Sequence, residues 1–432
     1  MQGMQRRDFL RFTGGLAGTA LLTACTRSPV VPRVPKVHAA SPTGAGTPRP
    51  IGHILYADVS SHLSAIDGSA GTTILSAERT VPSADWTRLY TVTPANRLVM
   101  LNATTGKELA GTAVPPGLVV RTVSGTGALV ALGPPPPASP YGGPGRRSTT
   151  IVVADPSGGT PPRTLRLDGN FEPDAFSRGG DALFVLEYLP ATAPDRYRVR
   201  MYDFVSGTLG PLWTRQKKLI PEGAEETMRG EGRAAVLAPD HRRLHTLYTH
   251  QPGHLHTRDL LAGRTAPGEK EPVHAFVHVL DLEQRWAYCV DLPEPFGRGP
   301  AERHTAAVSA DGLFVYDGSS GTLVKVGLES LAIERKARVG RASGTAWAAA
   351  SADSLYLAAG SSVRVVDGVS LKVREEWRLP GAAMGVAVSL DGGVYAGFDS
   401  GVIGFGSGGG GRETSRVPVA GMSRLRHVAT RV

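Results

Sequence analysis

Cysteine is scarce in this chain of 432 residues, which contains only Cys25 and Cys289. No disulfide can form within a domain that holds just one of the two. Tryptophan is also scarce, with five residues, whereas glycine and proline are abundant, with 54 and 33 residues. This composition favours a protein rich in turns, and the chain is long enough for one very large or two ordinary domains.

Motifs of common catalytic sites are missing as well. Neither Gly-x-Ser-x-Gly nor His-Glu-x-x-His occurs, and the glycine-rich stretch 406–411 lacks the Lys-Ser/Thr that ends a phosphate-binding loop. The net charge of +9 is not gathered into a basic stripe with stacking aromatic residues, so nucleic-acid binding is not expected. The sequence therefore contains no motif that indicates a particular reaction, and we expect no cofactor. Binding of a metal or a quinone stays an alternative.

Two export motifs follow one another at the N-terminus. The first, which consists of Arg6, Arg7, Phe9 and Leu10, resembles the twin-arginine export signal, and the apolar run after it is too short to span a bilayer. The second, Leu-Thr-Ala directly before Cys25, resembles a bacterial lipobox, in which the cysteine thiol is diacylated before cleavage. The alternative, an ordinary buried helix, is disfavoured by the arginines and prolines that flank the run.

Proline, serine, threonine and glycine dominate residues 25–50, which have few apolar side chains to offset the entropy of ordering. We therefore expect a signal peptide over 1–24, a lipidated Cys25 with a disordered tether over 25–50, and a folded body over 51–432. The resemblance implies anchoring at the extracytoplasmic face of the cell membrane, and we expect a monomer.

The body repeats one unit, and each copy begins with a short β-prone run. Turns such as Ser309-Ala310-Asp311-Gly312 precede several runs, and alternating segments such as 363–366 follow them. Four short antiparallel strands per unit are typical of a propeller blade. The eight runs are 54–59, 89–93, 128–132, 182–187, 244–249, 313–316, 355–359 and 394–398.

The region 51–432 resembles the bacterial β-propellers of the YVTN and WD-repeat-like superfamily. The step 361–367 resembles YVTN repeats and 98–108 resembles quinoprotein repeats, but the docking tryptophan of quinoprotein blades is mostly absent. The fold class is therefore all-β, an eight-bladed propeller, with seven blades or a pair of β-sandwiches as the alternatives. Residues 426–430 are expected to form an innermost strand, so that the two ends of the body share one blade and no edge stays open.

In such a propeller, the loops between the second and third strands and the links between blades lie on the same face, and this chain has long insertions at both places. The loops 134–147, 190–196 and 251–272 connect the second strand of a unit to its third, and 215–232 and 293–303 link neighbouring blades. Loops on a rigid scaffold are frequent recognition sites, so this sector is the expected partner surface for a protein or an envelope polymer. Its basic residues are candidate contacts for anionic groups, with nearby glutamates as the competing partners: Arg146, Arg147, Arg215, Lys217, Lys218, Arg229 and Arg233.

Histidines gather in the fifth unit, where His250, His254, His256 and His274 are candidate metal ligands with His304 at the same rim. Surface or hydrogen-bonded histidines are the simpler interpretation. His278 is expected to be a packed core residue, and Cys289 a buried, inert thiol in an apolar strand without a cationic neighbour.

Three functions remain open from the sequence. The first is a membrane-anchored binding or scaffold module, which requires no reaction. The second is a propeller enzyme of the lactonase or quinoprotein kind, with residues converging on the central channel. The third is an envelope protein that binds a metal through the histidine rim.

Overall fold

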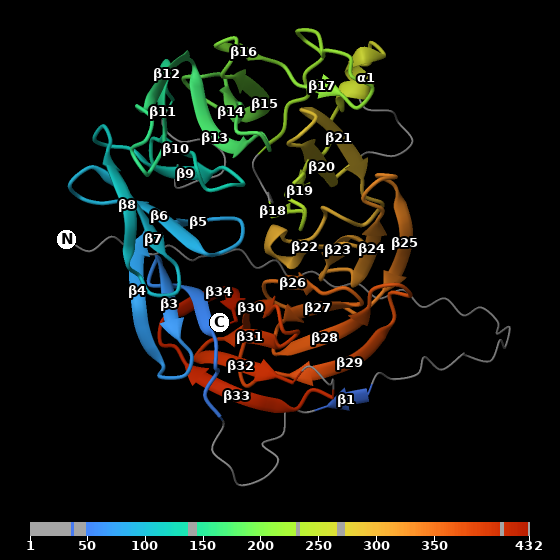
Figure 1. Cartoon of the computed structure of the whole chain (residues 1–432). Coiled ribbons are helices and arrows are strands. Elements are labelled where there is room, and N and C mark those ends of the chain that lie inside the picture. The colour runs from blue at the N-terminus through green and yellow to red at the C-terminus, as the bar shows by residue number, and fades with distance from the viewer. Residues whose placement is uncertain are drawn as a thin grey trace, which may run out of the picture. The chain divides into compact units, whose positions relative to one another are not determined.

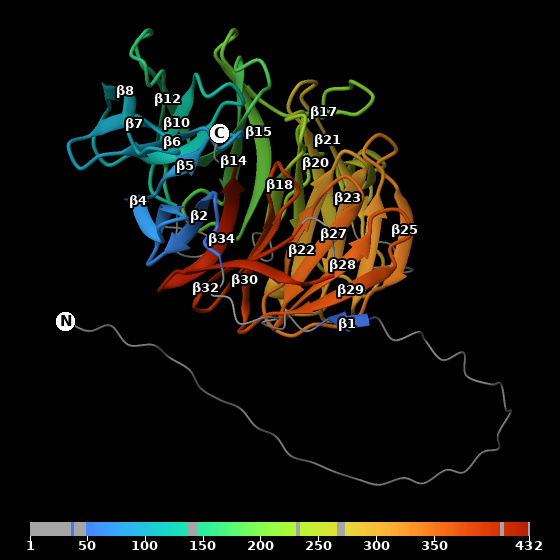
Figure 2. The same ribbon diagram turned by 60° about the horizontal axis from the view of Figure 1, so that its bottom comes forward.

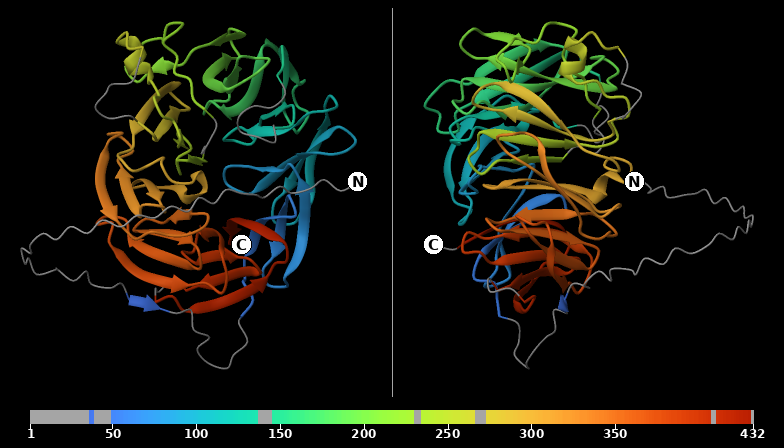
Figure 3. Two further views of the ribbon diagram at one scale, coloured as in Figure 1. Left: turned by 180° about the vertical axis from the view of Figure 1, so that it is seen from behind. Right: turned by 90° about the vertical axis from the view of Figure 1, so that its right-hand side faces the viewer.

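Eight antiparallel β-sheets are arranged in a ring within the unit Pro35–Val432 (Figure 1). The computed structural model describes residues 36–38, 49–136, 145–229, 234–265, 273–406 and 410–430. Each sheet has four principal strands, and Figure 3 shows the same ring from behind. The prediction of an all-β, eight-bladed propeller is confirmed, and the alternatives of seven blades and of paired sandwiches are wrong.

The strands of blades one to four, given from the first to the fourth in each blade, are as follows. Blade one has β34 (Met422–Ala429), β2 (Ile54–Val59), β3 (His62–Asp67) and β4 (Thr72–Glu78); blade two has β5 (Val81–Pro82), β6 (Arg88–Val92), β7 (Arg97–Asn102) and β8 (Glu108–Ala113). Blade three has β9 (Val119–Val123), β10 (Val130–Gly133), β11 (Ser148–Ala154) and β12 (Arg163–Asp168); blade four has β13 (Asn170–Phe176), β14 (Ala182–Leu189), β15 (Arg196–Asp203) and β16 (Thr208–Gly210).

Blades five to eight follow the same order, with additional strands on two of them. Blade five has β18 (Ala234–Leu237), β19 (Arg243–Tyr248), β20 (Phe276–Asp281) and β21 (Trp286–Asp291), with β17 (Trp213–Thr214) outside; blade six has β22 (His304–Ser309), β23 (Gly312–Asp317), β24 (Thr322–Val326) and β25 (Ile333–Arg338). Blade seven has β26 (Trp347–Ala350), β27 (Ser354–Ala359), β28 (Ser362–Asp367) and β29 (Val373–Arg378), with β1 (Lys36–His38) outside; blade eight has β30 (Ala383–Val388), β31 (Val394–Phe398), β32 (Gly401–Phe405) and β33 (Glu413–Pro418).

The ring is closed by the last strand of the chain. In β34, Met422 pairs with Val59 and Ala429 pairs with Ile54, so the C-terminal strand supplies the first strand of the blade that β2 begins (Figure 2). The predicted clasp is therefore confirmed. Because β34 occupies the open edge of β2, blade one presents no unpaired strand beside blade eight.

Strand alternation explains why the blades pack against one another on both sides. In β19, Leu247 belongs to a hydrophobic cluster shared with blade six, whereas the next residue, Tyr248, belongs to a cluster shared with blade four. Successive side chains of a strand point to opposite faces of its sheet, and both faces of a blade are covered by neighbours. The described core accordingly divides into clusters that each lie between two adjacent blades.

The turns between the third and fourth strands repeat one capping device. The Asp203 carboxylate accepts hydrogen bonds from the backbone N–H groups of Val205 at 2.9 Å and Ser206 at 2.8 Å, which closes the turn locally. The same position is polar in five other blades, where it is filled by Asp67, Asn102, Asp155, Asp281 and Asp367. We call the face that bears these turns the lower face. The upper face bears the loops between strands two and three and the ends of the blade-to-blade links.

Part of the expected tether has a defined position. β1 pairs in parallel with β29, with Lys36 opposite Glu375, and the Arg49 carbonyl accepts a hydrogen bond from the Arg416 amide at 3.0 Å. These residues have backbone partners on the open strand edges of blades seven and eight. Residues 25–35 and 39–48, Cys25 included, and the export motif over residues 6–10 lie outside the described residues.

Helical structure is limited to the loops in the described part of the chain, with α1 (Thr257–Leu261) and the 3-10 turn η1 (Ala301–Arg303). Among these residues there is no helix with the length and hydrophobicity needed to cross a membrane.

Candidate functional site

A cluster of buried polar side chains lies between blades four and five. Its centre is the carboxylate of Glu226, which comes from the link between the two blades. Around it stand His254 and His256 from the loop before α1, His278 from β20 and Cys289 from β21. We call these five residues the Glu226 cluster.

Backbone contacts hold Glu226 at this place. Two residues further on, Met228 forms two hydrogen bonds with Tyr197 at the start of β15, at 2.7 and 2.9 Å. The Gln251 side chain then holds the next residue, because its Oε1 accepts from the Arg229 amide and its Nε2 donates to the Arg229 carbonyl. The Glu226 carboxylate itself accepts a hydrogen bond from the Thr257 amide at 3.1 Å. The link is thus fixed to blade four and to the 251–256 loop of blade five.

The two loop histidines approach the same oxygen of Glu226. Oε2 lies 3.4 Å from His256 Nδ1 and 3.8 Å from His254 Nε2, and the two imidazole rings meet edge to face at 4.6 Å. Both side chains are almost completely buried, with 3% and 2% exposed for His254 and His256. Within the described residues neither of these ring nitrogens makes a well-directed hydrogen bond.

The ring of His256 is also held from its other side. Its Nε2 lies 2.6 Å from Asp291 Oδ1, and the Arg258 guanidinium contacts the other oxygen of that carboxylate. Burial alone would lower the pKa of His256, but the carboxylates of Asp291 and Glu226 raise it to about 9. His256 is therefore an imidazolium in this arrangement, and it stabilises the two anions beside it.

Charge also determines the states of Glu226 and Cys289. Burial raises the pKa of a carboxyl group, but the neighbouring histidines hold the pKa of Glu226 well below its usual range. Burial and the Glu226 anion both raise the pKa of Cys289 well above its usual range. The thiol is consequently protonated and donates to Glu226 Oε1 at 3.0 Å.

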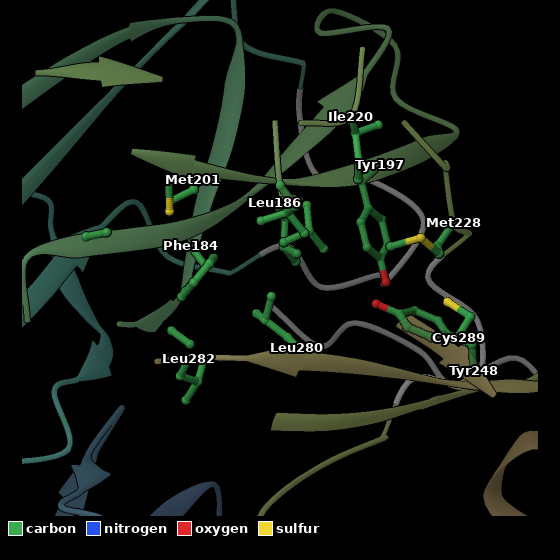
Figure 4. Packing of buried hydrophobic residues seen from close by; sticks show 14 of the residues in the cluster. Phe184, Leu186, Tyr197, Met201, Ile220, Met228, Tyr248, Leu280, Leu282 and Cys289 are labelled. Carbon is green, nitrogen blue, oxygen red and sulfur yellow. The ribbon is translucent and has the colours of Figure 1, made fainter. Parts of the chain in front are cut away.

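Hydrophobic residues form the floor of the cluster. Cys289 belongs to the core between blades four and five together with Tyr248 and Met228 (Figure 4). Phe276 stacks on His254 with ring centroids 4.3 Å apart. This apolar surrounding excludes water from one side of the Glu226 cluster and strengthens the electrostatic interactions within it.

Two cavities reach the cluster from solvent. One of 360 Å³ is lined by His254 together with Arg229 and Glu225. The other, of 260 Å³, is lined by Glu226, His256 and Cys289, with Arg258 and Tyr288 on its walls. His254 therefore borders the first of these cavities, and Glu226, His256 and Cys289 border the second.

The other predicted histidines have different partners. His250 Nδ1 lies 2.9 Å from the Thr249 hydroxyl, and His274 Nε2 lies 3.7 Å from Glu294. His304 accepts a hydrogen bond from the Gly297 amide at 3.1 Å. Of the four candidate ligands, the structure brings together only His254 and His256, and the groupings of potential ligand atoms found in the described residues contain neither His250 nor His274.

The sequence predicts other roles for three members of the cluster. Glu226 is one of the glutamates expected to compete for the basic residues of the partner surface, and His278 and Cys289 are expected to be core residues without a ligand. His278 and Cys289 are buried as expected, but their register in the sheet and the route of the link bring them to Glu226. Direct pairing of two short strands could have indicated the His278–Cys289 contact, whereas nothing in the spacing indicates Glu226.

The predicted basic partner surface is not gathered on one face. Arg146 and Arg229 lie on the upper face, where their backbone amides bond to Ala191 and to Gln251, and Arg147 follows Arg146 there. Arg215 and Lys217 lie on the lower face, where they donate to the carbonyls of Glu329 and Gln284 in third-to-fourth strand turns.

The reason for this division is the path of the link, and it corrects the expectation that 215–232 stays on one face. β17 pairs in parallel with the first residues of β21, so the chain reaches the outer edge of blade five near the lower face and rises beside β21 before 226–229 reach the upper face. Lys218 belongs to the hairpin that follows β17, where its carbonyl accepts a hydrogen bond from the Thr214 amide, and Arg233 lies outside the described residues.

Comparison with known proteins supports the fold and nothing finer. No family model matches the chain, and no curated protein matches its sequence. The structure is similar to apo AztD from Citrobacter koseri, with a TM-score of 0.50, 11% identity and coverage of 87% of this chain and 96% of that one. It is also similar to the dihydro-heme d1 dehydrogenase NirN in complex with DHE (TM-score 0.47, 14% identity, 89% and 76% coverage) and to BamB from Moraxella catarrhalis (0.43, 12%, 82% and 93%).

Proposed function

We propose that this protein is an exported β-propeller that binds a divalent transition-metal ion of the zinc class through Glu226, His254 and His256. The observation that carries the proposal is the convergence of two buried imidazole nitrogens on one carboxylate oxygen. Of the three functions that the sequence left open, metal binding is the one that a grouping of potential ligand atoms in the described residues supports.

The distances suit such an ion. Zinc bonds to histidine nitrogen and carboxylate oxygen are about 2.0–2.2 Å, which places two ligands of a tetrahedral site about 3.3–3.6 Å apart. The separations from Glu226 Oε2, 3.4 Å to His256 and 3.8 Å to His254, need only a small closure. The proton on His256 neutralises part of the charge of the buried carboxylates, and a bound cation would take over this role when the proton leaves.

The residues behind the ligands support the same interpretation. Histidine ligands of zinc commonly donate their second ring N–H to a carboxylate, which fixes the tautomer and the ring orientation. His256 has this arrangement, because Nδ1 faces Glu226 while Nε2 lies 2.6 Å from Asp291. Arg258 fixes Asp291 in turn, through its contact with the second carboxylate oxygen.

Zinc titration of the full-length chain, treated with a chelator beforehand and followed by calorimetry, tests the proposal. We expect a stoichiometric site in the wild type and at least a tenfold loss of affinity in His254→Ala and in His256→Ala. His274→Ala is the matched control, since it removes a histidine of the same blade that contacts Glu294 instead of Glu226. Equal affinity in all four proteins, or no binding by the wild type, would refute the site.

The location is part of the proposal and rests on the N-terminal motifs. Arg6 and Arg7 support export, and Cys25 supports a lipid anchor at the extracytoplasmic face of the membrane. Replacing Cys25 with Ala should release the protein from the membrane fraction. Retention of the Cys25→Ala protein in that fraction would contradict the anchor while leaving the metal site untouched.

A further inference from the structure

The Glu226 carboxylate faces two different groups of side chains, one with each oxygen. Oε2 faces His254 and His256, as described above. Oε1 lies 3.0 Å from Cys289 Sγ and 3.6 Å from His278 Nε2. The ligand atoms of this second group also lie within 4.8 Å of one another.

Sheet register brings the two residues of the second group together. His278 in β20 pairs directly with Cys289 in β21, so their side chains project from the same face of blade five, toward blade four. Both are buried, with 3% and 4% of their surface exposed. This pair belongs to the rigid sheet, whereas His254 and His256 belong to the loop before α1.

We propose that Glu226 bridges two metal positions, and that the second is formed by Glu226 Oε1, His278 Nε2 and Cys289 Sγ. This inference rests on the proposed function, because the shared carboxylate is a ligand of the first position. Each oxygen of a bridging carboxylate binds a different ion, and paired sites of this kind hold their ions about 3.5–4 Å apart.

The donor set determines which ions the second position takes. Borderline and soft cations such as zinc or cobalt bind well to a thiolate together with an imidazole, whereas magnesium and calcium prefer oxygen ligands. When the ion binds, the Cys289 S–H bond breaks, the proton leaves to solvent, and sulfur donates an electron pair to the metal without any change in oxidation state. The first position lacks a sulfur ligand, so the two positions are chemically distinguishable.

A cavity borders the second position. Glu226, His256 and Cys289 are among the residues that line the 260 Å³ cavity, so it adjoins both proposed positions. The Arg258 guanidinium in the same lining is already paired with Asp291 and with the Cys289 carbonyl at 3.0 Å. It therefore holds β21 in place instead of repelling the ion as a free cation.

Cobalt(II) titration of the full-length chain without oxygen tests the two positions separately, because cobalt bound to a thiolate gives a charge-transfer band in the near ultraviolet. We expect two equivalents and this band in the wild type. Cys289→Ser should bind one equivalent without the band, and His254→Ala should bind tightly only one equivalent, with the band. His274→Ala is the control and should behave as the wild type, and circular dichroism of each variant verifies folding.

Other outcomes overturn the inference in recognisable ways. One equivalent without the band in the wild type removes the second position and leaves the proposed function intact. One equivalent with the band, lost in both variants, means a single ion held by all five residues and contradicts the bridge. No cobalt binding at all overturns both proposals. If Cys289→Ser does not fold, His278→Asn replaces it, with the same expectation of one equivalent and no band.

Discussion

Acid should destabilise this propeller through His245, a histidine of β19 that shares its side of the strand with Leu247 in the core between blades five and six. The side chain is 1% exposed, and neither ring nitrogen has a hydrogen-bond partner among the described residues. Burial, assisted by the nearby Arg243 charge, lowers the pKa of His245 to about 4. The folded protein therefore keeps this imidazole neutral.

The sign of the effect follows from the two states of the chain. The unfolded chain binds a proton at His245 below pH about 6.5, whereas the folded protein does so only below about 4. Stability contributed by the neutral ring is therefore complete above pH 6.5 and is lost as the pH falls toward 4. Between pH 7 and pH 5 the free energy of unfolding should decrease by about 2 kcal/mol from this residue, or about 2–3 °C in melting temperature for a domain of this size.

Thermal melting of wild type and His245→Leu at pH 7 and pH 5 measures this contribution. The variant cannot bind a proton at this position, so its melting temperature should decrease by about 2–3 °C less than that of the wild type over the same interval. Leu247→Ala is the matched control, because it should lower stability at both pH values by the same amount. Equal pH dependence of wild type and His245→Leu would refute the reasoning.

Three further predictions concern the ring itself. Removal of residues 421–432 should cause aggregation on gel filtration, because blade one loses its first strand and β2 becomes an open edge; a monomeric truncated protein would contradict the clasp. Glu172→Gln should lower the free energy of unfolding by about 2 kcal/mol in denaturant titration, since it removes the anionic partner of Arg121, a largely covered side chain 2.9 Å from Glu172; a loss below about 0.5 kcal/mol would contradict the importance of this pair. Gly297→Ala should lower the melting temperature, because Gly297 has φ +80° and an added Cβ would meet the His274 carbonyl oxygen at 2.4 Å; an unchanged melting temperature would show that the loop adjusts.

The fold could be predicted because its determinants are local. Each blade requires short alternating strands and turns closed by their own side chains, such as the turn at Asp203, and these patterns recur along the chain. The clasp was predictable as well, since a body that begins with a second strand needs a first strand from its other end. The pairing of β1 with β29 was not predictable, because a proline-rich segment gives no periodic pattern that would indicate a strand.

Half of the site depended on contacts that the sequence does not encode locally. His254 and His256 stand two residues apart, so their proximity was expected even though they lie on a loop instead of a strand. Glu226 reaches them only because the link between blades four and five is held by Met228 and Gln251. The same unforeseen path carries Arg215 to the lower face, which separates the basic residues that spacing had grouped together.

X-ray absorption at the zinc edge, on the full-length chain loaded with zinc, tests the central claim most directly. The account predicts histidine nitrogen and carboxylate oxygen ligands at about 2.0–2.2 Å, a sulfur ligand at about 2.3 Å, and weaker histidine scattering, from His278 alone, in the variant with both His254→Ala and His256→Ala. A shell of oxygen atoms alone, or a spectrum unchanged in that variant, would show that zinc binds elsewhere and would contradict the account.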